Sequence, residues 1–96
     1  MGSNIIDWRC LDTNKEKQQL SIPKGALILS VCVKHENIYF FVEQDVNARI
    51  GRDYTETVEF AVIKDGRHFE TNDYQFLGTV VLNFGNDIYH VLYRYL

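Results

Sequence analysis

The sequence predicts an all-β domain, a small antiparallel sandwich or partly closed barrel of about seven strands. Three observations lead to this fold class. Short stretches rich in β-branched, aromatic and other apolar residues recur along the chain, and turn residues separate them. No stretch repeats apolar residues with the spacing of a helix. The connections between the stretches are mostly short, as they are where strands pair antiparallel.

Length and composition indicate one domain, residues 1–96, with a single hydrophobic core. The 46% of hydrophobic residues excludes a disordered chain, and no apolar run approaches the roughly 20 residues of a membrane-spanning helix. The N-terminus lacks the basic and apolar regions of a signal peptide, and residues 1–3 are expected to be an expression remnant. A net charge of −3 with scattered basic residues argues against binding duplex nucleic acid through a broad basic face.

Residues 26–34 are predicted to form the strand around which the others assemble. Apolar residues occupy both alternating sets of positions there, which in water is expected of a strand covered on both faces. A tight turn, Pro23-Lys24-Gly25, precedes this strand, with Pro at the second turn position and Gly at the fourth. The other predicted strands are residues 5–11, 18–22, 38–43, 55–64, 74–82 and 88–96.

Local sequence features add detail to these strands. The first two are expected to pair as a hairpin, and residues 35–37 are expected to form a three-residue turn. The alternation within residues 55–64 places three apolar side chains toward the core and Glu59 toward solvent. Asp65-Gly66 is a strong turn signal after that strand.

Glycine and cysteine positions carry two further structural expectations. Gly78, in the middle of a predicted strand, indicates a bulge or a place where a bulky neighbour crosses closely. Cys10 and Cys32 each lie inside an apolar strand, and in an intracellular protein we expect them to be buried free thiols.

The last predicted strand, residues 88–96, is apolar on both faces. One face carries Tyr89, Val91, Tyr93 and Tyr95, and the other carries Ile88, Leu92 and Leu96. Together with the other two-sided strands, this exceeds the apolar surface that one sandwich of this length can cover. Because an exposed apolar patch usually marks a contact surface, we predict a homo-oligomer, most simply a two-fold dimer.

Two loops carry the candidate ligand-binding residues. Residues 44–54 contain Arg49 and Arg52 around Gly51, followed by Tyr54. Two guanidinium groups can hold one phosphate from two sides, and a tyrosine ring can stack on a base. The alternative is an ordinary solvated loop with surface arginines, because the motif lacks the spacing and the strand–helix context of a phosphate-binding loop.

Arg67 and His68, in the loop of residues 67–73, add a charge and a ring donor. If the two loops meet at one end of the sandwich, these residues would share one pocket with the two arginines and the tyrosine of the first loop. Alternatively, Arg67 and His68 pair with Glu70 or Asp73 of their own loop.

We expect no catalysis, metal or cofactor. The three histidines, His35, His68 and His90, fall on separate predicted elements without metal-ligand spacing. His90 lies on an apolar strand, where we expect a hydrogen-bonded structural residue. No serine lies in a nucleophile elbow, neither cysteine lies in a loop typical of reactive thiols, and the acidic residues form no recognisable acid–base pair.

Three segments together resemble a family of small proteins encoded by tailed phages and prophages: IPKGALILSV at 22–31, FLGTVVL at 76–82 and YHVLY at 89–93. Members of that family are similar in size, begin with a hairpin ahead of the PKGA turn and end on an aromatic-His-Val strand. The resemblance spans residues 5–93, and the departures are a longer 44–54 loop and the C-terminal extension YRYL.

The resemblance implies a phage accessory protein that acts in the cytoplasm of an infected bacterial host. Small accessory proteins of this kind often resemble counter-defence factors. The first function implied is non-catalytic sequestration of a nucleotide-derived immune signal, with the loop arginines on phosphate and the loop aromatics on the base. The alternatives are a protein–protein inhibitor of a host defence effector, of the anti-CRISPR kind, which uses the aromatic surface of the last strand, and a minor virion or regulatory component.

Overall fold

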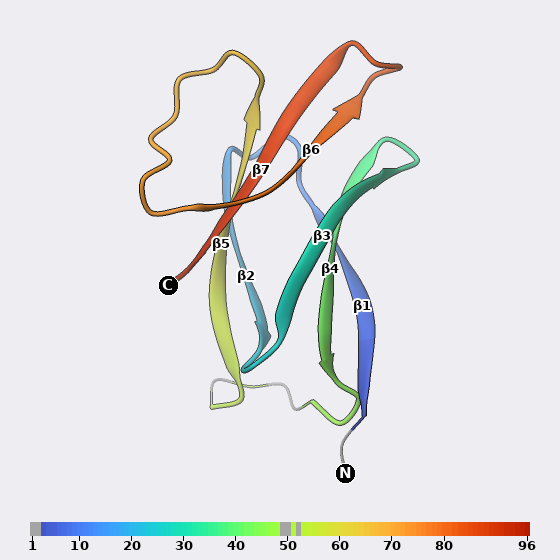
Figure 1. Ribbon diagram of the computed structural model, residues 1–96, viewed down its shortest axis with the longest axis vertical. Coiled ribbons are helices and arrows are strands. Elements are labelled where there is room, and N and C mark those ends of the chain that lie inside the picture. Colours follow the sequence, from blue (N-terminus) through green and yellow to red (C-terminus); the bar gives the residue numbers. More distant parts are fainter. Residues whose placement is uncertain (1–2, 49–50, 52) are drawn as a thin grey trace.

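The computed structural model describes residues 3–48, 51 and 53–96, and these residues form seven strands and no helix (Figure 1). The strands are β1 (Asn4–Leu11), β2 (Lys17–Pro23), β3 (Leu27–Lys34), β4 (Asn37–Asp45), β5 (Thr55–Lys64), β6 (Gln75–Leu82) and β7 (Asp87–Tyr95). All strand pairs are antiparallel. The predicted all-β fold class is therefore confirmed. In the described part of the chain, no helix is long and apolar enough to cross a membrane.

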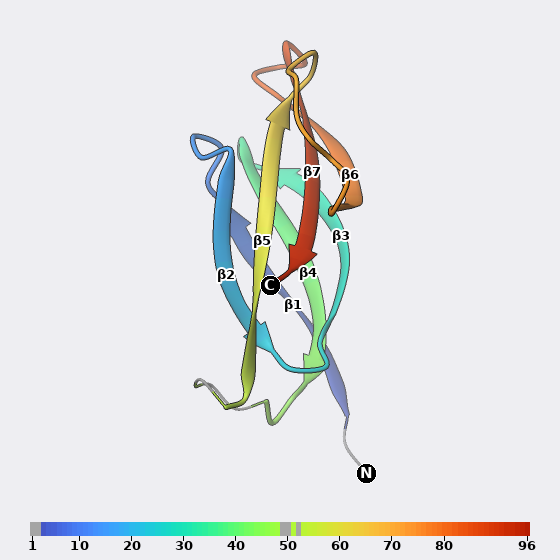
Figure 2. The same cartoon turned by 90° about the vertical axis from the view of Figure 1, so that its left-hand side faces the viewer.

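The strands form two sheets that pack face to face as a sandwich. Sheet A has the order β1-β4-β3, and sheet B has the order β2-β5-β7-β6. Figure 2 shows sheet B in front and sheet A behind it. The largest fully buried side chains between them are Phe40, Phe60, Leu11, Ile22, Ile38, Val42, Val58 and Val91. The rings of Phe40 and Phe60, one from each sheet, lie 4.4 Å apart at their centroids and join the two halves of the core.

β5, in the interior of sheet B, is the strand that is covered on both faces. On its inner face Val58, Phe60 and Val62 are buried, as predicted. On its outer face Ala61 and Ile63 are also buried, because the segment 67–74 crosses over sheet B (Figure 1). Phe69 and Tyr74 of that segment pack against this outer face, together with Leu92 of β7.

The prediction that residues 26–34 form a central strand with two covered faces is wrong. β3 lies at the edge of sheet A, where it pairs with β4. Leu27 and Leu29 are 58% and 41% exposed. A strand with apolar side chains on both faces is more stable when both faces are shielded from water. The pattern does not show that other parts of the same chain provide the shielding.

β1 and β2 do not form the predicted hairpin, since β1 pairs with β4 in one sheet and β2 pairs with β5 in the other. The connection between them carries the chain from sheet A to sheet B. The Gln18 amide stabilises this connection, because it donates a hydrogen bond to the Asp12 carbonyl oxygen and accepts one from the Asp12 N–H, both at 2.8 Å. Arg9 Nη1 also donates to the Ser21 carbonyl oxygen at 3.1 Å and bridges the two strands.

The turns were located correctly, but their geometry differs from the prediction. The Ala26 N–H donates to the Pro23 carbonyl oxygen at 3.1 Å, so Pro23 is the first turn residue and Gly25, with φ of 81°, is the third. The turn between β3 and β4 has two residues instead of three. His35 and Glu36 both have positive φ there, as in a type I′ hairpin.

Both expectations for Gly78 are confirmed. The β6–β7 register shifts between Phe76 and Gly78, which is the irregularity that the glycine predicted. A Cβ at position 78 would lie 2.6 Å from Val31 Cγ1 of β3. β6 and β3 are edge strands of different sheets, so Gly78 allows the two sheets to approach closely along one side of the sandwich.

The predicted exposure of Glu59 and burial of both cysteines are wrong. Glu59 points away from the core, yet it is only 8% exposed because the 67–74 segment and Arg94 cover it. Cys10 is exposed and Cys32 is partly exposed. Both thiols belong to sheet A, whose outer face is not covered in the way that sheet B is.

The last strand presents only part of the predicted exposed patch, at Ile88, Tyr95 and Leu96. Val91 is fully buried, and Tyr89 and Tyr93 pack against the core from the inner face of β7. Leu92, on the other face, is buried beneath the 67–74 segment. The tyrosine row of this strand therefore mainly builds the sandwich.

Candidate functional site

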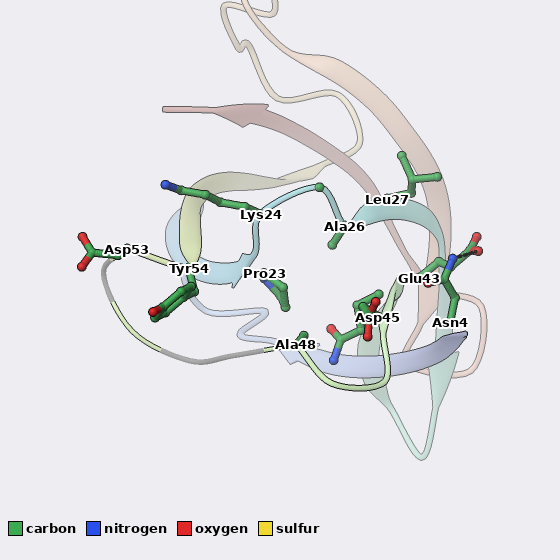
Figure 3. Close-up of a pocket in the computed structure, with 12 residues that line it drawn as sticks. Asn4, Pro23, Lys24, Ala26, Leu27, Glu43, Asp45, Ala48, Asp53 and Tyr54 are labelled. Atoms are coloured by element: carbon green, nitrogen blue, oxygen red, sulfur yellow. Dashed lines mark hydrogen bonds between the residues drawn. The ribbon is translucent and has the colours of Figure 1, made fainter. Parts of the chain in front are cut away.

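A pocket of about 350 Å³ lies at the end of the sandwich where the β4–β5 connection meets the 23–27 turn (Figure 3). Tyr54 and Lys24 line it, and the Lys24 N–H donates to the Tyr54 carbonyl oxygen at 2.9 Å. Arg49 and Arg52 lie outside the described residues. Of the first-loop candidates, the structure therefore places Tyr54 alone.

The described lining of this loop-end pocket is mainly acidic. Glu43, Asp45 and Asp53 contribute three carboxylates against the single ammonium of Lys24, which extends away from Asp45 in Figure 3. Two unit charges about 5 Å apart interact by roughly 1 kcal/mol in bulk water and by more in a partly buried site. These carboxylates therefore disfavour a phosphate group in the described part of the pocket.

Arg67 and His68 lie at the opposite end of the sandwich. Tyr54 directly precedes β5 and Arg67 follows it, so the ten-residue strand separates them by roughly 30 Å (Figure 1). His68 is exposed, and Arg67 Nη2 lies 3.7 Å from Glu16 Oε2 instead of pairing with Glu70 or Asp73. Arg67 and His68 therefore do not share a pocket with Tyr54. Loop composition alone cannot predict whether two loops lie at the same end of the sandwich. Their positions depend on how the strands pair.

Sheet A presents a second concave surface, which the sequence did not predict. A groove of about 290 Å³ crosses its outer face and is lined by Trp8, Cys32, Lys34, His35, Tyr39 and Phe41. We call this the aromatic groove. The Trp8 and Tyr39 rings meet edge to face, with centroids 5.1 Å apart and planes at 87°. Three aromatic side chains, a lysine and a histidine thus lie together without a carboxylate in the lining.

Strand register explains why these side chains gather on one face. Trp8 pairs with Phe41, and Cys10 pairs with Tyr39, so the four side chains lie on the same side of sheet A. Phe40, between Tyr39 and Phe41 in sequence, points the other way and is fully buried. The side chains on the outer face are accessible to solvent, and Trp8 is 59% exposed. Alternation in β1 and β4 is the sequence signal that could have located this face.

A family model described as a domain of unknown function, DUF7352, matches residues 4–96. The chain belongs to the DUF7352 family. The match includes all seven strands and therefore both sheets of the sandwich. No curated protein and no solved structure matches the chain.

The main polar network of this DUF7352 domain lies on sheet B, away from the groove. The Tyr74 hydroxyl donates a short hydrogen bond to Glu59 Oε1, and Arg94 Nη2 lies 2.9 Å from the same oxygen. Arg94 also lies over the Tyr74 ring, 4.7 Å from its centroid. The Tyr74 hydrogen bond and the Arg94 charge lower the pKa of Glu59 against the opposing effect of burial. Burial and Glu59 raise the pKa of Tyr74 to about 12. This network fastens the 67–74 segment to sheet B.

His90 takes part in a second chain of hydrogen bonds on sheet B. Its Nδ1 lies 2.9 Å from Thr79 Oγ1, and its Nε2 lies 2.8 Å from Asp65 Oδ1. His90 therefore links β7 to β6 and to the turn after β5, so it is hydrogen-bonded as expected. Among the described residues, no three His, Cys, Asp or Glu side chains are grouped to hold a metal ion.

Proposed function

We propose that this DUF7352 protein is a non-catalytic binding protein that sequesters a small ligand of the nucleotide class in the aromatic groove of sheet A. The observation that carries the proposal is the groove itself, which combines Trp8, Tyr39 and Phe41 with Lys34 and His35. In the setting that the phage resemblance implies, the ligand is a nucleotide-derived immune signal in the infected bacterial host. Sequestration would then act as counter-defence.

The chemistry of the groove matches the two parts of a nucleotide. Every base has a π-face, and stacking on an aromatic side chain contributes about 1–3 kcal/mol per base. Trp8 and Tyr39 offer ring surfaces of that kind. At one end of the groove, the Lys34 ammonium and the His35 ring can donate hydrogen bonds to phosphate oxygens. Sequestration requires only binding, and no covalent bond is made or broken, so we assign no catalytic residue.

The loop-end pocket is a weaker site for the same ligand class. Tyr54 offers a ring there, and Arg49 and Arg52 belong to the connection between Ala48 and Asp53, which both line the pocket. The described carboxylates of that pocket work against a phosphate, whereas the lining of the aromatic groove has none. We therefore assign the ligand to the groove.

Inhibition of a host protein is a second candidate function. The observation that favours it is that exposed apolar side chains continue beyond the groove, at Ile6 and Leu27. A larger apolar face suits a protein partner better than a small ligand. In this case the partner would bind the outer face of sheet A and not the last strand.

Calorimetric titration with cyclic dinucleotides and with cyclic ADP-ribose tests the proposal. We expect saturable binding that Trp8→Ala weakens by tenfold to about a hundredfold, the equivalent of one stacked base. Tyr54→Ala, in the loop-end pocket, should bind normally. Loss of binding in Tyr54→Ala with normal binding in Trp8→Ala would move the site to the loops. A heat-stable ultraviolet-absorbing molecule captured from defence-active lysate supports sequestration, and a stoichiometric host protein in its place supports the inhibitor.

A further inference from the structure

The two sheets of the sandwich differ in how their outer faces are covered. The 67–74 segment covers the β5 side of sheet B, where Phe69 and Tyr74 pack on buried apolar residues, although Phe76, Val81 and Ile88 stay exposed on its β6 side. In Figure 1 no described segment crosses the outer face of sheet A. Ile6, Trp8 and Leu27 are each more than half exposed on that side. We call this surface the open face; it includes Ile6, Trp8, Cys10, Leu27, Cys32, Lys34, Tyr39, Phe41, Glu43 and Asp45.

The open face has Lys34 at one end and the carboxylates of Glu43 and Asp45 at the other. Lys34 pairs in register with Asn37 at the start of β4, and Glu43 lies near the end of the same strand. Six residue steps along β4 separate Asn37 from Glu43, which is about 20 Å. In the described part of the chain, neither Lys34 nor Glu43 forms a salt bridge. Glu36, the nearest carboxylate in sequence to Lys34, accepts a hydrogen bond from the Asn83 N–H and is thus directed toward sheet B.

This arrangement is complementary to itself. A two-fold axis that lies between two facing sheets and runs perpendicular to their strands exchanges the strand ends. It would place Lys34 of each copy opposite Glu43 of the other. Tyr39 and Phe41 lie between these two charged positions, so each would face the other's counterpart at the centre of the contact. Sheets packed face to face in this way lie about 10 Å apart, with their side chains interdigitated.

We propose that a second copy of this chain covers the open face in a two-fold dimer and closes the aromatic groove. The role of the closed groove rests on the proposed function, whereas the dimer itself rests on the open face. A shallow groove on one sheet leaves a nucleotide largely in water, and a facing sheet would enclose it between two sets of aromatic side chains. The site is therefore incomplete in a single copy.

The size of the open face sets the expected strength of the dimer. Three strands of about eight residues cover roughly 26 by 14 Å. This area, roughly 360 Å² on each copy, is below the roughly 800 Å² per partner of a standard stable interface, so we expect a weak dimer with a dissociation constant of tens of micromolar without ligand.

Sedimentation equilibrium of the full chain, over a range of concentrations up to about 100 μM, tests the dimer. The wild type should dimerise. Trp8→Glu should be monomeric, because it places a carboxylate at the apolar centre. Phe84→Ser is the matched control: Phe84 is 93% exposed in the β6–β7 turn, so this variant should dimerise as the wild type does. Thermal unfolding should show that all three proteins are folded.

Charge reversal tests the proposed orientation of the two copies. Lys34→Glu alone and Glu43→Lys alone should each raise the dissociation constant at least tenfold, because each puts two like-charged pairs into the contact. An equimolar mixture of these two variants should dimerise, since both of its pairs are then opposite in charge. A wild type that stays monomeric at about 100 μM overturns the inference, and so does a mixture that dimerises no better than either variant alone.

Failure of the dimer and failure of the proposed function can be told apart on the same samples. If the protein dimerises but binds no nucleotide, the inference about the open face holds and the proposed ligand is wrong. If the protein binds nucleotide and stays a monomer, the proposed ligand class holds and the proposed dimer is wrong. A monomer that instead binds a host protein through Trp8 assigns the open face to that partner.

Discussion

Gly78 of β6 lies against Val31 of β3, where the two sheets meet. A Cβ at position 78 would lie 2.6 Å from Val31 Cγ1, which is nearer than real side-chain carbons approach. The contact lies where the edge strands of sheets A and B meet, at the register shift of β6. The absence of a side chain at position 78 thus sets how closely that side of the sandwich closes.

Gly78→Ala should lower the free energy of unfolding by about 1–3 kcal/mol, because the added methyl group would clash with the Val31 side chain. In the Val31→Ala background the same change should cost less, since the clashing methyl group is gone. Chemical denaturation of the four proteins in this double-mutant cycle measures the coupling. An equal cost of Gly78→Ala in both backgrounds would show that the two residues are independent.

Phe60→Ala should lower the free energy of unfolding by about 3–5 kcal/mol, because it removes a fully buried ring that contacts Phe40 across the core. Leu29→Ala should cost less than about 1 kcal/mol, because Leu29 is well exposed on the edge strand β3. Denaturation midpoints give both values. Similar decreases in the free energy of unfolding for the two variants would indicate that β3 is buried like a central strand, in contradiction of its position at the sheet edge.

Glu59 should make stability depend on pH. Its pKa in the folded protein is lowered from 4.5 by the Tyr74 hydrogen bond and by Arg94. A depressed pKa stabilises the fold at pH values above the unfolded pKa, and this contribution is lost as the pH falls through the folded pKa. The free energy of unfolding should therefore decline below about pH 5.

Glu59→Gln should remove that part of the decline and should cost about 1–3 kcal/mol at pH 7, because Arg94 and Tyr74 lose a charged acceptor. Glu70→Gln, an exposed change in the 67–74 segment, is the control and should leave both the stability and its pH profile nearly unchanged. Identical pH profiles for Glu59→Gln and the wild type would remove Glu59 from the account.

The sequence predicted the strands well, and the sheets poorly, for one physical reason. Alternation, turn residues and Gly78 are local signals, and they located the seven strands and the close contact. Strand pairing is not local. It placed β1 beside β4, moved the chain between sheets after Leu11 and made β5 the covered strand.

The site was predicted less well than the fold because it depends on that pairing. Trp8 and Phe41 are far apart in the chain, and only the β1–β4 register brings them together. The chemistry of the loop arginines is visible in the sequence, whereas the position of each loop in the fold is not. Arg67 and Tyr54 ended at opposite ends of β5 for this reason.

Cys10 and Cys32 should both react with a thiol reagent in dilute native protein, without denaturant. They flank Tyr39 on the open face, where they are exposed or partly exposed. Two strand spacings, about 10 Å, separate their Cα atoms, so they should form no disulfide within one chain. The rate of reaction should fall at high protein concentration, as the second copy covers the face. Thiols that react only after unfolding would contradict the exposure of this face.

Fluorescence of Trp8 tests most directly the central claim that the outer face of sheet A is the binding surface. Trp8 is the only tryptophan in the chain and lies in the aromatic groove. Titration with cyclic dinucleotides or cyclic ADP-ribose should change its emission in a saturable way, because a stacked base replaces water on the indole ring. Tyr39→Ala should weaken the response. Emission that stays unchanged up to about 1 mM of these ligands, where even weak binding would register, would contradict the account.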